Sequence, residues 1–526
     1  MKFTQKHAKA TAIILSLILC LSFVGCEAGM EAENYAPGEN FAPSISGKED
    51  AFLEDYVAEF ATEAEAEAET DASGRDENEG KAFAENPFVS TEENNVSTFS
   101  ADVDTASYSY FRKLVNSGYQ INHLIGSGTA FRTEEFINYF KYDVPKPLEN
   151  ELFGVYSELT PCPWNAETVL LRLTLQAEQA REAKGNNLVF LIDVSGSMSS
   201  QDKLPLLKNA FSYLVSNLGG DDIVSIVTYS GREAVVLEGC NGLESTKIMN
   251  AINSLNSGGS TNGEAGLTRA YQIAEQYYLE DGNNRIIMAS DGDLNVGISS
   301  QSELTSYIEQ KRDQGVYLSV LGFGTGNYRD GNMEALADNG NGVYYYIDGE
   351  SEAEKVFGTD LLGTLYAVAE DVKLQLEFDP EAVESYRLIG YENRRLSRED
   401  FEDDTKDAGE VGASHQVTVC YELKLASHAI KASPFVTLRV RYKNLGEPIS
   451  LLNEYEIGQD DFSQSMSEDQ RFICALIEAC MVLHNSQYLG DLTVEGILED
   501  LNSMELSEYP DRQEFRELVQ KMMQLQ

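Results

Sequence analysis

The stretch Asn186-Asn-Leu-Val-Phe-Leu-Ile-Asp-Val-Ser-Gly-Ser-Met198 decides the fold of this chain. Its apolar run from Leu188 to Ile192 is continuous, which is typical of a strand that is buried on both faces of a parallel sheet. Asp193, Ser195 and Ser197 follow at the carboxyl end of that strand, where open α/β sheets bind their ligands. Because carboxylate and hydroxyl oxygens are hard ligands, the pattern favours a cation such as Mg²⁺.

The surrounding residues, 187–367, alternate apolar runs with amphipathic segments of helical period. We predict strands at Leu188–Ile192, Ile223–Tyr229, Ala234–Leu237, Arg285–Ala289, Tyr317–Gly322 and Val343–Ile347. Repeated strand–helix units of this kind predict an α/β fold, a doubly wound parallel sheet with right-handed crossovers.

Two further loops carry polar residues at predicted strand ends. Ser257-Gly-Gly-Ser-Thr261 precedes a helical pattern, and Ala289-Ser-Asp-Gly292 ends a long strand. Because neighbouring parallel strands end at the same edge of a sheet, these loops can meet the first one despite their distance in sequence. Three loops would then supply two carboxylates and three hydroxyls.

Together these loops resemble the metal-ion-dependent adhesion site of the von Willebrand factor type A family, which has the pattern Asp-x-Ser-x-Ser, then Thr, then Asp. The resemblance implies a metal site made of Asp193, Ser195, Ser197, Thr261 and Asp291. It implies Mg²⁺ as the bound cation, with Mn²⁺ and Ca²⁺ as alternatives. It also implies that the cation captures an Asp or Glu carboxylate of a partner protein. Asp293, next to the site, is interpreted as a solvated turn residue.

A closer resemblance, to bacterial lipoproteins that carry this domain between two extensions, covers about residues 96–450. The C-terminal extension of that family is a domain of unknown function. Four stretches carry the resemblance: Ala101-Asp-Val-Asp-Thr-Ala-Ser-Tyr108, Pro161-Cys-Pro-Trp-Asn165, Leu321-Gly-Phe-Gly-Thr-Gly-Asn327 and Tyr386-Arg-Leu-Ile-Gly-Tyr-Glu-Asn393.

The N-terminus has the features of a lipoprotein signal. Residues 1–25 combine a basic start with an apolar run that is short for a membrane span. The signal resembles those of bacterial lipoproteins, which implies cleavage before Cys26 and lipid on its thiol. We therefore expect an extracytoplasmic protein that is attached to the cell membrane through this lipid. An ordinary secretory signal or a short membrane helix is the alternative.

Residues 26–95 are expected to form a disordered acidic tether. Residues 27–95 hold 20 Asp and Glu against 3 Lys and Arg, and such a low-hydrophobicity, self-repelling segment cannot bury a core. The whole chain of 526 residues has a net charge of −48. This charge argues against nucleic acid as a partner, because binding phosphates needs a basic surface.

The regions on either side of 187–367 are predicted to be β-rich. We divide them into 96–186, an α+β extension; 368–450, a β-rich domain; and 451–526, a helical segment. Two strands are predicted before residues 187–367, at Phe153–Leu159 and Thr168–Leu175, and two strands alone are marginal in water. We therefore expect the strands before and after residues 187–367 to form one sandwich, into which the α/β domain is inserted. We also expect the metal face to point away from this β-domain. The five cysteines after Cys26 are predicted to be buried free thiols.

The resemblance implies a surface-anchored, metal-dependent protein-binding module, used for adhesion or as a scaffold, and no enzyme activity. A regulatory subunit of a membrane or ATPase-driven complex is an alternative, as is a hydrolase with its site in the flanking domains. A hydrolytic serine needs a general base beside it, and no histidine of the chain adjoins a G-x-S-x-G sequence.

Overall fold

The computed structural model describes residues 84–125, 131–149, 151–179, 185–231, 233–259, 263–292, 301–324, 330–360, 363, 367–426 and 434–525. All of them belong to one compact unit, Glu77–Gln526. Among these residues no helix has both the length and the apolar character that a membrane span requires. Cys26 and the predicted signal and tether up to residue 83 lie outside the described ranges.

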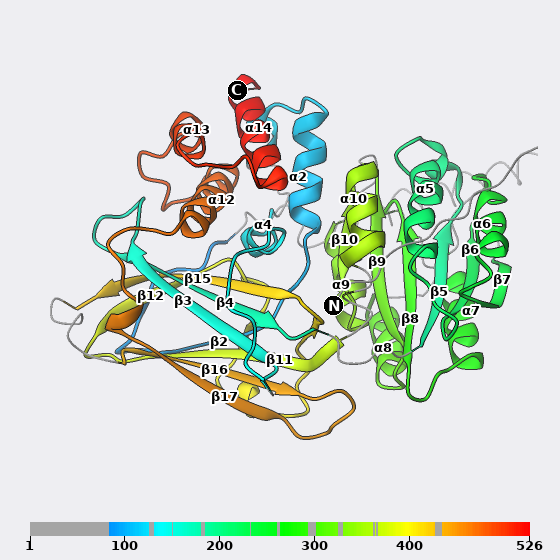
Figure 1. The fold of residues 1–526 in the computed structure, drawn as a ribbon, viewed down its shortest axis with the longest axis horizontal. Coiled ribbons are helices and arrows are strands. Elements are labelled where there is room, and N and C mark those ends of the chain that lie inside the picture. Colours follow the sequence, from blue (N-terminus) through cyan, green and yellow to red (C-terminus); the bar gives the residue numbers. More distant parts are fainter. Residues whose placement is uncertain are drawn as a thin grey trace, which may run out of the picture. The chain divides into compact units, whose positions relative to one another are not determined.

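A six-stranded sheet forms the centre of the α/β domain (Figure 1). Its order is β10-β9-β8-β5-β6-β7, and its strands are β5 (Asn186–Asp193), β6 (Ile223–Tyr229), β7 (Ala234–Asn241), β8 (Asn283–Ser290), β9 (Tyr317–Phe323) and β10 (Tyr344–Ile347). All strand pairs are parallel except β6–β7, which is antiparallel. The predicted doubly wound sheet is confirmed, and its β6–β7 edge is antiparallel because only residues 230–233 join these strands, whereas a parallel connection needs a long crossover.

Helices cover both faces of this sheet, as a doubly wound fold requires (Figure 1). One apolar core joins β5 to α5 (Leu204–Val215), α6 (Ser245–Asn253) and α10 (Glu350–Lys355). The core on the other face joins β5 to α7 (Gly263–Gln276), α8 (Gln301–Arg312) and α9 (Asp330–Asn339). β5 has no exposed residue, so the continuous apolar run indicated its central position correctly.

Two antiparallel sheets form a second body, a β-sandwich with one shared core. The first has the order β1-β12-β15-β4-β3 and the second the order β13-β2-β11-β16-β17, with β14 pairing β11. The strands are β1 (Val89–Ser90), β2 (Val96–Ser100), β3 (Phe153–Pro161), β4 (Val169–Ala177), β11 (Ala367–Phe378), β12 (Val383–Ile389), β13 (Arg395–Leu396), β14 (Gly409–Gly412), β15 (Gln416–Leu425), β16 (Val436–Lys443) and β17 (Leu451–Ile457).

Strands from before and after the α/β domain are neighbours in both sheets. β11 lies between β2 and β16, with Leu374 opposite Phe99. β15 lies between β4 and β12, with Val419 opposite Leu173. The α/β domain is therefore inserted into the sandwich, as we expected from the small number of strands on either side.

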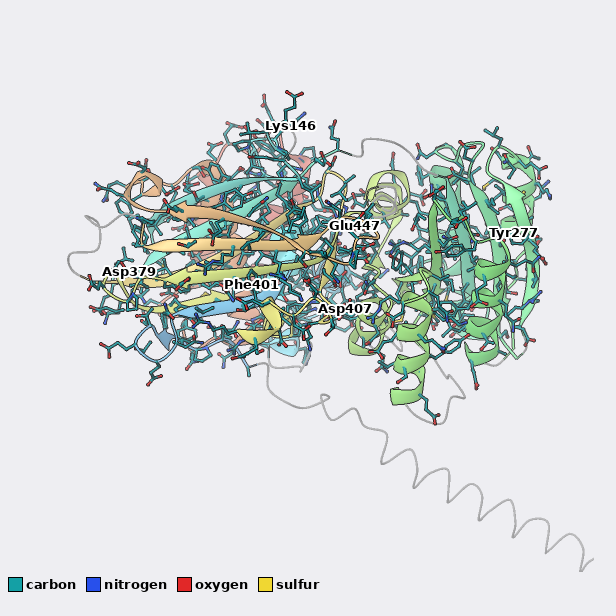
Figure 2. All side chains as sticks on the ribbon, turned by 90° about the horizontal axis from the view of Figure 1, so that it is seen from below. Lys146, Tyr277, Asp379, Phe401, Asp407 and Glu447 are labelled. Carbon is teal, nitrogen blue, oxygen red and sulfur yellow. The ribbon has the colours of Figure 1, made fainter. Side chains whose placement is uncertain are left out.

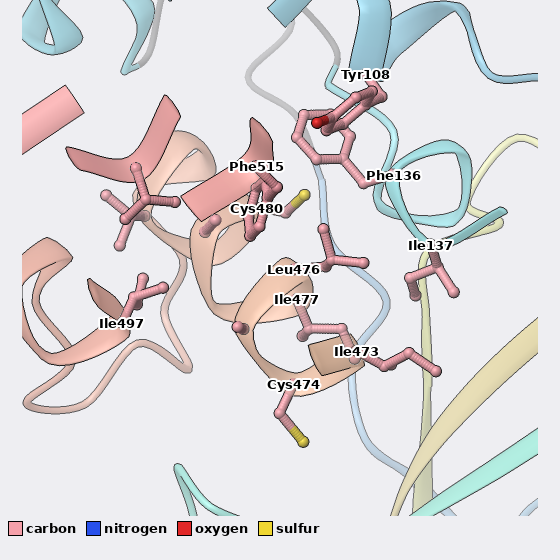
Figure 3. Close-up of a cluster of buried hydrophobic side chains, with 14 of the residues drawn as sticks. Tyr108, Phe136, Ile137, Ile473, Cys474, Leu476, Ile477, Cys480, Ile497 and Phe515 are labelled. Carbon is pink, nitrogen blue, oxygen red and sulfur yellow. The ribbon is translucent and has the colours of Figure 1, made fainter. Parts of the chain in front are cut away.

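A helical layer packs on the sandwich (Figure 1), and one core joins its N-terminal and C-terminal helices (Figure 3). Its helices are α2 (Ala106–Asn116), α3 (Ile121–Leu124), α4 (Thr133–Asn138), α12 (Glu468–His484), α13 (Val494–Asn502) and α14 (Pro510–Gln524). Ser467 caps α12 by accepting a hydrogen bond from the Gln470 amide. Leu476 of α12, Phe515 of α14 and Tyr108 of α2 share one core. The predicted C-terminal helices thus pack against the helices of the N-terminal extension and share their core. All five cysteines after Cys26 are free and buried, as predicted.

Two boundaries of our domain division differ from the structure. Residues 84–95 were assigned to the tether, yet Val89 and Ser90 pair with β12, and Asn86 Nδ2 donates to the Gly390 carbonyl at 2.8 Å. Residues 451–457 were assigned to the helical segment but form β17, an edge strand of the sandwich. Asn and Glu are uncommon in strands, and their presence in 451–457 concealed the strand.

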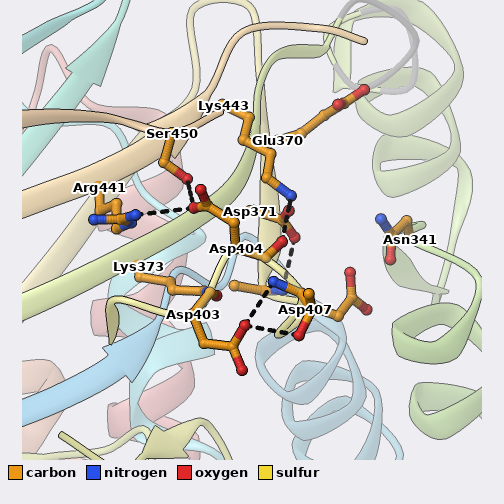
Figure 4. Close-up of polar contacts among 12 residues, drawn as sticks. Asn341, Glu370, Asp371, Lys373, Asp403, Asp404, Asp407, Arg441, Lys443 and Ser450 are labelled. Carbon is orange, nitrogen blue, oxygen red and sulfur yellow. Dashed lines mark hydrogen bonds and ion pairs between the residues drawn. The ribbon is translucent and has the colours of Figure 1, made fainter. Parts of the chain in front are cut away.

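Residues 397–410, which we call the pinned loop and whose last two residues begin β14, have polar contacts with the sandwich and with the α/β domain (Figure 4). Lys373 Nζ donates to the Asp403 carbonyl at 2.6 Å, and Arg441 forms a 3.0 Å ion pair with Asp404. Glu410 accepts a 2.9 Å hydrogen bond from Asn341 of the α/β domain. The pinned loop, with Phe401 and Asp407 labelled in Figure 2, therefore contacts both bodies through its polar groups.

Candidate metal centre

The first loop of the predicted site is built directly on the end of β5. Asp193 is fully buried, and its Oδ1 accepts a 2.7 Å hydrogen bond from the Ser195 amide. This bond turns the backbone into a short 3₁₀ helix, Gly196–Ser199. The Oγ atoms of Ser195 and Ser197 come to 2.9 Å of each other. With the spacing Asp-x-Ser-x-Ser, one buried carboxylate therefore stabilises a turn that brings the two serine hydroxyls close together.

The second loop is attached to the first by backbone hydrogen bonds. The Gly258 amide donates to the Val194 carbonyl at 2.7 Å, and the Gly196 amide donates to the Gly259 carbonyl at 3.2 Å. Gly259 has φ +89°, and a Cβ there would lie 2.5 Å from Ser230 Oγ, so this approach requires glycine. Thr261 lies outside the described residues, and so does Asp293.

The third loop follows β8, the parallel neighbour of β5. Asp291 is 1% exposed, and its Oδ2 accepts a 2.7 Å hydrogen bond from Lys203 Nζ, with which it forms an ion pair. Lys203 Nζ also donates to the Ser197 carbonyl at 3.1 Å. The structure therefore joins Asp193, Ser195 and Ser197 directly, and it links Asp291 to Ser197 through Lys203, which we did not predict.

Buried oxygens give this site its electrostatic character. Burial raises the pKa of Tyr229 well above its usual value, and the nearby Asp193 carboxylate raises it further, so Tyr229 stays protonated. Asp291 Oδ1 is buried without a hydrogen-bond partner among the described residues. A buried carboxylate oxygen without a partner is costly, and a cation near the serine hydroxyls would offset that cost. The residues therefore fit a hard divalent cation.

Carboxylates alone would not hold that cation. Within the described ranges no group of three or more His, Cys, Asp or Glu side chains is arranged to hold a metal ion. Metal binding here would depend on Ser195 and Ser197, whose neutral hydroxyls leave most of the cation's charge uncompensated. Such a site favours an additional anionic ligand.

The metal face also contacts the N-terminal extension. Lys113 of α2 forms a 3.0 Å ion pair with Asp202, which lies beside Lys203 in the first loop and accepts a 2.6 Å hydrogen bond from Ser200. Burial opposes ionisation of Asp202, but the hydrogen bonds from Ser200 and Lys113 lower its pKa. This contact is made by α2 of the N-terminal extension and not by a strand of the sandwich, so the orientation of the metal face away from the β-domain stays a prediction.

Two partly buried histidines of the described chain lie elsewhere. His415 follows β14 in the sandwich, and burial lowers its pKa to about 3. His484 ends α12 and contacts the Phe131 carbonyl at 2.7 Å, and burial lowers its pKa to about 4. Neither residue belongs to the loops that carry Ser195, so neither supports a hydrolytic serine there.

Comparison with known proteins agrees with this architecture. Residues 187–359 match the sequence profile "von Willebrand factor type A domain", residues 75–172 match "von Willebrand factor", and residues 363–525 match "Uncharacterized protein YfbK, C-terminal". The Escherichia coli (strain K12) protein YfbK, described as uncharacterized, is 38% identical over 444 residues, which are 79% of this chain and 76% of YfbK. The chain belongs to the YfbK family of von Willebrand factor type A proteins.

More distant relatives share a smaller part of the chain. Human inter-alpha-trypsin inhibitor heavy chain H3 is 26% identical over 189 residues, which are 34% of this chain and 21% of that protein. A solved structure described as "von Willebrand factor type A from Catenulispora acidiphila" is 17% identical, covers 73% of this chain and 88% of its own, and has a TM-score of 0.42. Von Willebrand factor type A domains typically mediate protein interactions, commonly bind a divalent metal at this site and are generally not enzymes.

Proposed function

We propose that this protein is a surface-anchored, non-enzymatic module that binds a partner protein through a divalent cation, with Mg²⁺ as the cation in the cell. The observation that carries the proposal is the convergence of Ser195 Oγ and Ser197 Oγ to 2.9 Å beside the buried Asp291. Ser195, Ser197 and Thr261 would hold the cation, and Asp193 and Asp291 would support it. When bound, the cation supplies a strong electrophilic position for an Asp or Glu carboxylate of the partner.

The arrangement of charge supports a binding role. Asp193 and Asp291 both make hydrogen bonds to groups of the site itself, to the Ser195 amide and to Lys203. Direct coordination would then rest on neutral hydroxyls, and a partner carboxylate would complete the charge balance. The chain is strongly acidic, with a net charge of −48. It therefore repels acidic partner proteins unless a cation bound to the chain attracts their carboxylates.

Loss of the two hydroxyls is expected to abolish metal-dependent capture. In a pull-down from an extract of the source cells, the wild type should retain a set of proteins in Mg²⁺ that EDTA releases. Ser195→Ala/Ser197→Ala should retain none of that set, because the cation loses its direct ligands. Ser200→Ala, at an exposed serine of the same loop, is the matched control and should behave like the wild type. Retention by the double variant equal to wild type would contradict the proposal.

Membrane attachment is proposed to depend on lipid at Cys26. The support is the order of basic start, apolar run and Gly25-Cys26 in the sequence. Cys26→Ala should move the protein from the detergent phase to the aqueous phase on Triton X-114 partition, and Cys20→Ala should leave the partition unchanged. A Cys26→Ala protein that still enters the detergent phase would rule out a lipid anchor at this residue.

A further inference from the structure

Lys203 occupies a position that local preference does not explain. It lies at the N-terminus of α5, where the helix dipole disfavours a positive charge. Its side chain is 11% exposed, and its ammonium forms the 2.7 Å ion pair with Asp291 Oδ2. Burying an ammonium is expensive unless a carboxylate pairs with it. Two unfavourable free-energy contributions, from the helix dipole and from burial of the ammonium, therefore accompany the placement of Lys203 beside Asp291.

A glycine directly after β9 leaves room for the side chain of Lys203. Gly324 follows β9 with φ +73°, and a Cβ there would lie 2.2 Å from Lys203 Cε. Its carbonyl accepts a 2.9 Å hydrogen bond from Tyr346, which fixes the backbone at this point. Gly324 thus allows Lys203 to pack against the metal loops.

We propose that Lys203 is a positioning residue that sets how strongly the site binds its cation and how strongly that cation binds a carboxylate. The inference rests on the proposed metal-dependent function. The ammonium holds Asp291 by one oxygen, Oδ2, and leaves Oδ1 without a hydrogen-bond partner among the described residues. The ammonium also balances the negative charge of Asp291, which is one of the two buried carboxylates of the site. The other is Asp193.

This compensation has opposite consequences for the two ligands. A fixed positive charge beside the site repels a divalent cation, so the site binds that cation more weakly than two uncompensated carboxylates would. The same positive charge leaves the bound cation more electrophilic and favours an incoming anion. Lys203 therefore lowers the affinity of the site for the divalent cation and raises the affinity of the bound cation for a carboxylate. A residue that only stabilised the loops would raise both the affinity for the cation and the affinity for the carboxylate.

The test uses the full chain with Mn²⁺ as the metal and acetate as the carboxylate. Lys203→Gln removes the charge but keeps a donor for Asp291, and it should bind Mn²⁺ about tenfold more tightly than wild type by calorimetry. Water-proton relaxation of the Mn²⁺-loaded protein should require about tenfold more acetate for the same change. Lys203→Met, a second neutral variant, should shift both affinities in the same directions.

Lys208→Gln is the matched control, because Lys208 lies on the same helix but donates to the Asn253 and Leu255 carbonyls. It should equal wild type in both measurements, and circular dichroism should confirm that every variant is folded. If folded Lys203→Gln and Lys203→Met bind Mn²⁺ as wild type does, or less tightly, the inference about Lys203 is overturned and the proposed function stands. If wild type itself binds no Mn²⁺, the proposed function fails and the inference fails with it.

Discussion

Residues 368–447 expressed alone are expected to remain unfolded, whereas residues 187–367 expressed alone are expected to fold cooperatively. In the first fragment β11 loses its neighbour β2, and β15 loses its neighbour β4. In the whole protein β11 and β15 lie at the centre of their sheets, so each would have an unpaired edge in the fragment. The shared core would also lose Phe99, Leu171 and Leu173. The second fragment keeps nearly all of both cores that cover its sheet.

Urea unfolding followed by circular dichroism distinguishes these outcomes. Residues 187–367 should give a single sigmoidal transition, and 368–447 should give no native baseline. A chain that joins residues 84–186 to 367–525 through a flexible Gly/Ser linker is the control. It restores the missing strand partners and should fold. A cooperative transition for 368–447 alone would contradict insertion of the α/β domain into the sandwich.

Replacing Arg394 by Met is expected to destabilise the protein by about 3–5 kcal/mol, because it would leave several buried carboxylates without their cation. Arg394 forms ion pairs with Asp338 of α9 at 2.7 Å, with Asp104 at 3.2 Å and with Asp102 at 3.3 Å. Asp102 and Asp104 belong to the N-terminal extension, and both are buried. Burial opposes the charge of Arg394, yet these carboxylates raise its pKa well above the usual value.

The matched control is Arg439→Met, which removes an arginine from the surface of β16. Arg439 pairs with Glu377 and with Glu454, and the Glu454 side chain is 54% exposed. Exposed pairs of this kind contribute about 0–1 kcal/mol. The two variants should therefore differ by several degrees in melting temperature. Equal melting temperatures would show that the Arg394 cluster does not join the α/β domain to its host.

The sequence predicted the centre of the site because its pattern is local. Asp193, Ser195 and Ser197 belong to one turn that follows one buried strand, and the hydrogen bond from the Ser195 amide to Asp193 needs only that spacing. Asp291 could be added because parallel neighbours end at the same edge of a sheet. The pooling of strands into one sandwich was predicted from their small number on either side.

Other features depend on long-range contacts that no local pattern reveals. Lys203 was missed because its partner, Asp291, is 88 residues away in the chain, and a lysine before a helix is usually a solvated residue. β2 was missed because Ser and Thr dominate its sequence, although Phe99 lies in the core. The reversed direction of β7 could have been predicted from the short connection that precedes it. The contact of Lys113 with Asp202 depends on how α2 packs against β10.

We propose that Ser195 and Ser197, supported by Asp291 and Lys203, form a divalent-cation site. Anomalous diffraction from crystals of the full chain grown with Mn²⁺ tests it most directly. We expect one strong anomalous peak within bonding distance of both serine Oγ atoms, with Lys203 still paired to Asp291. A map with no peak at these hydroxyls, or with the peak at another group of residues, would contradict it.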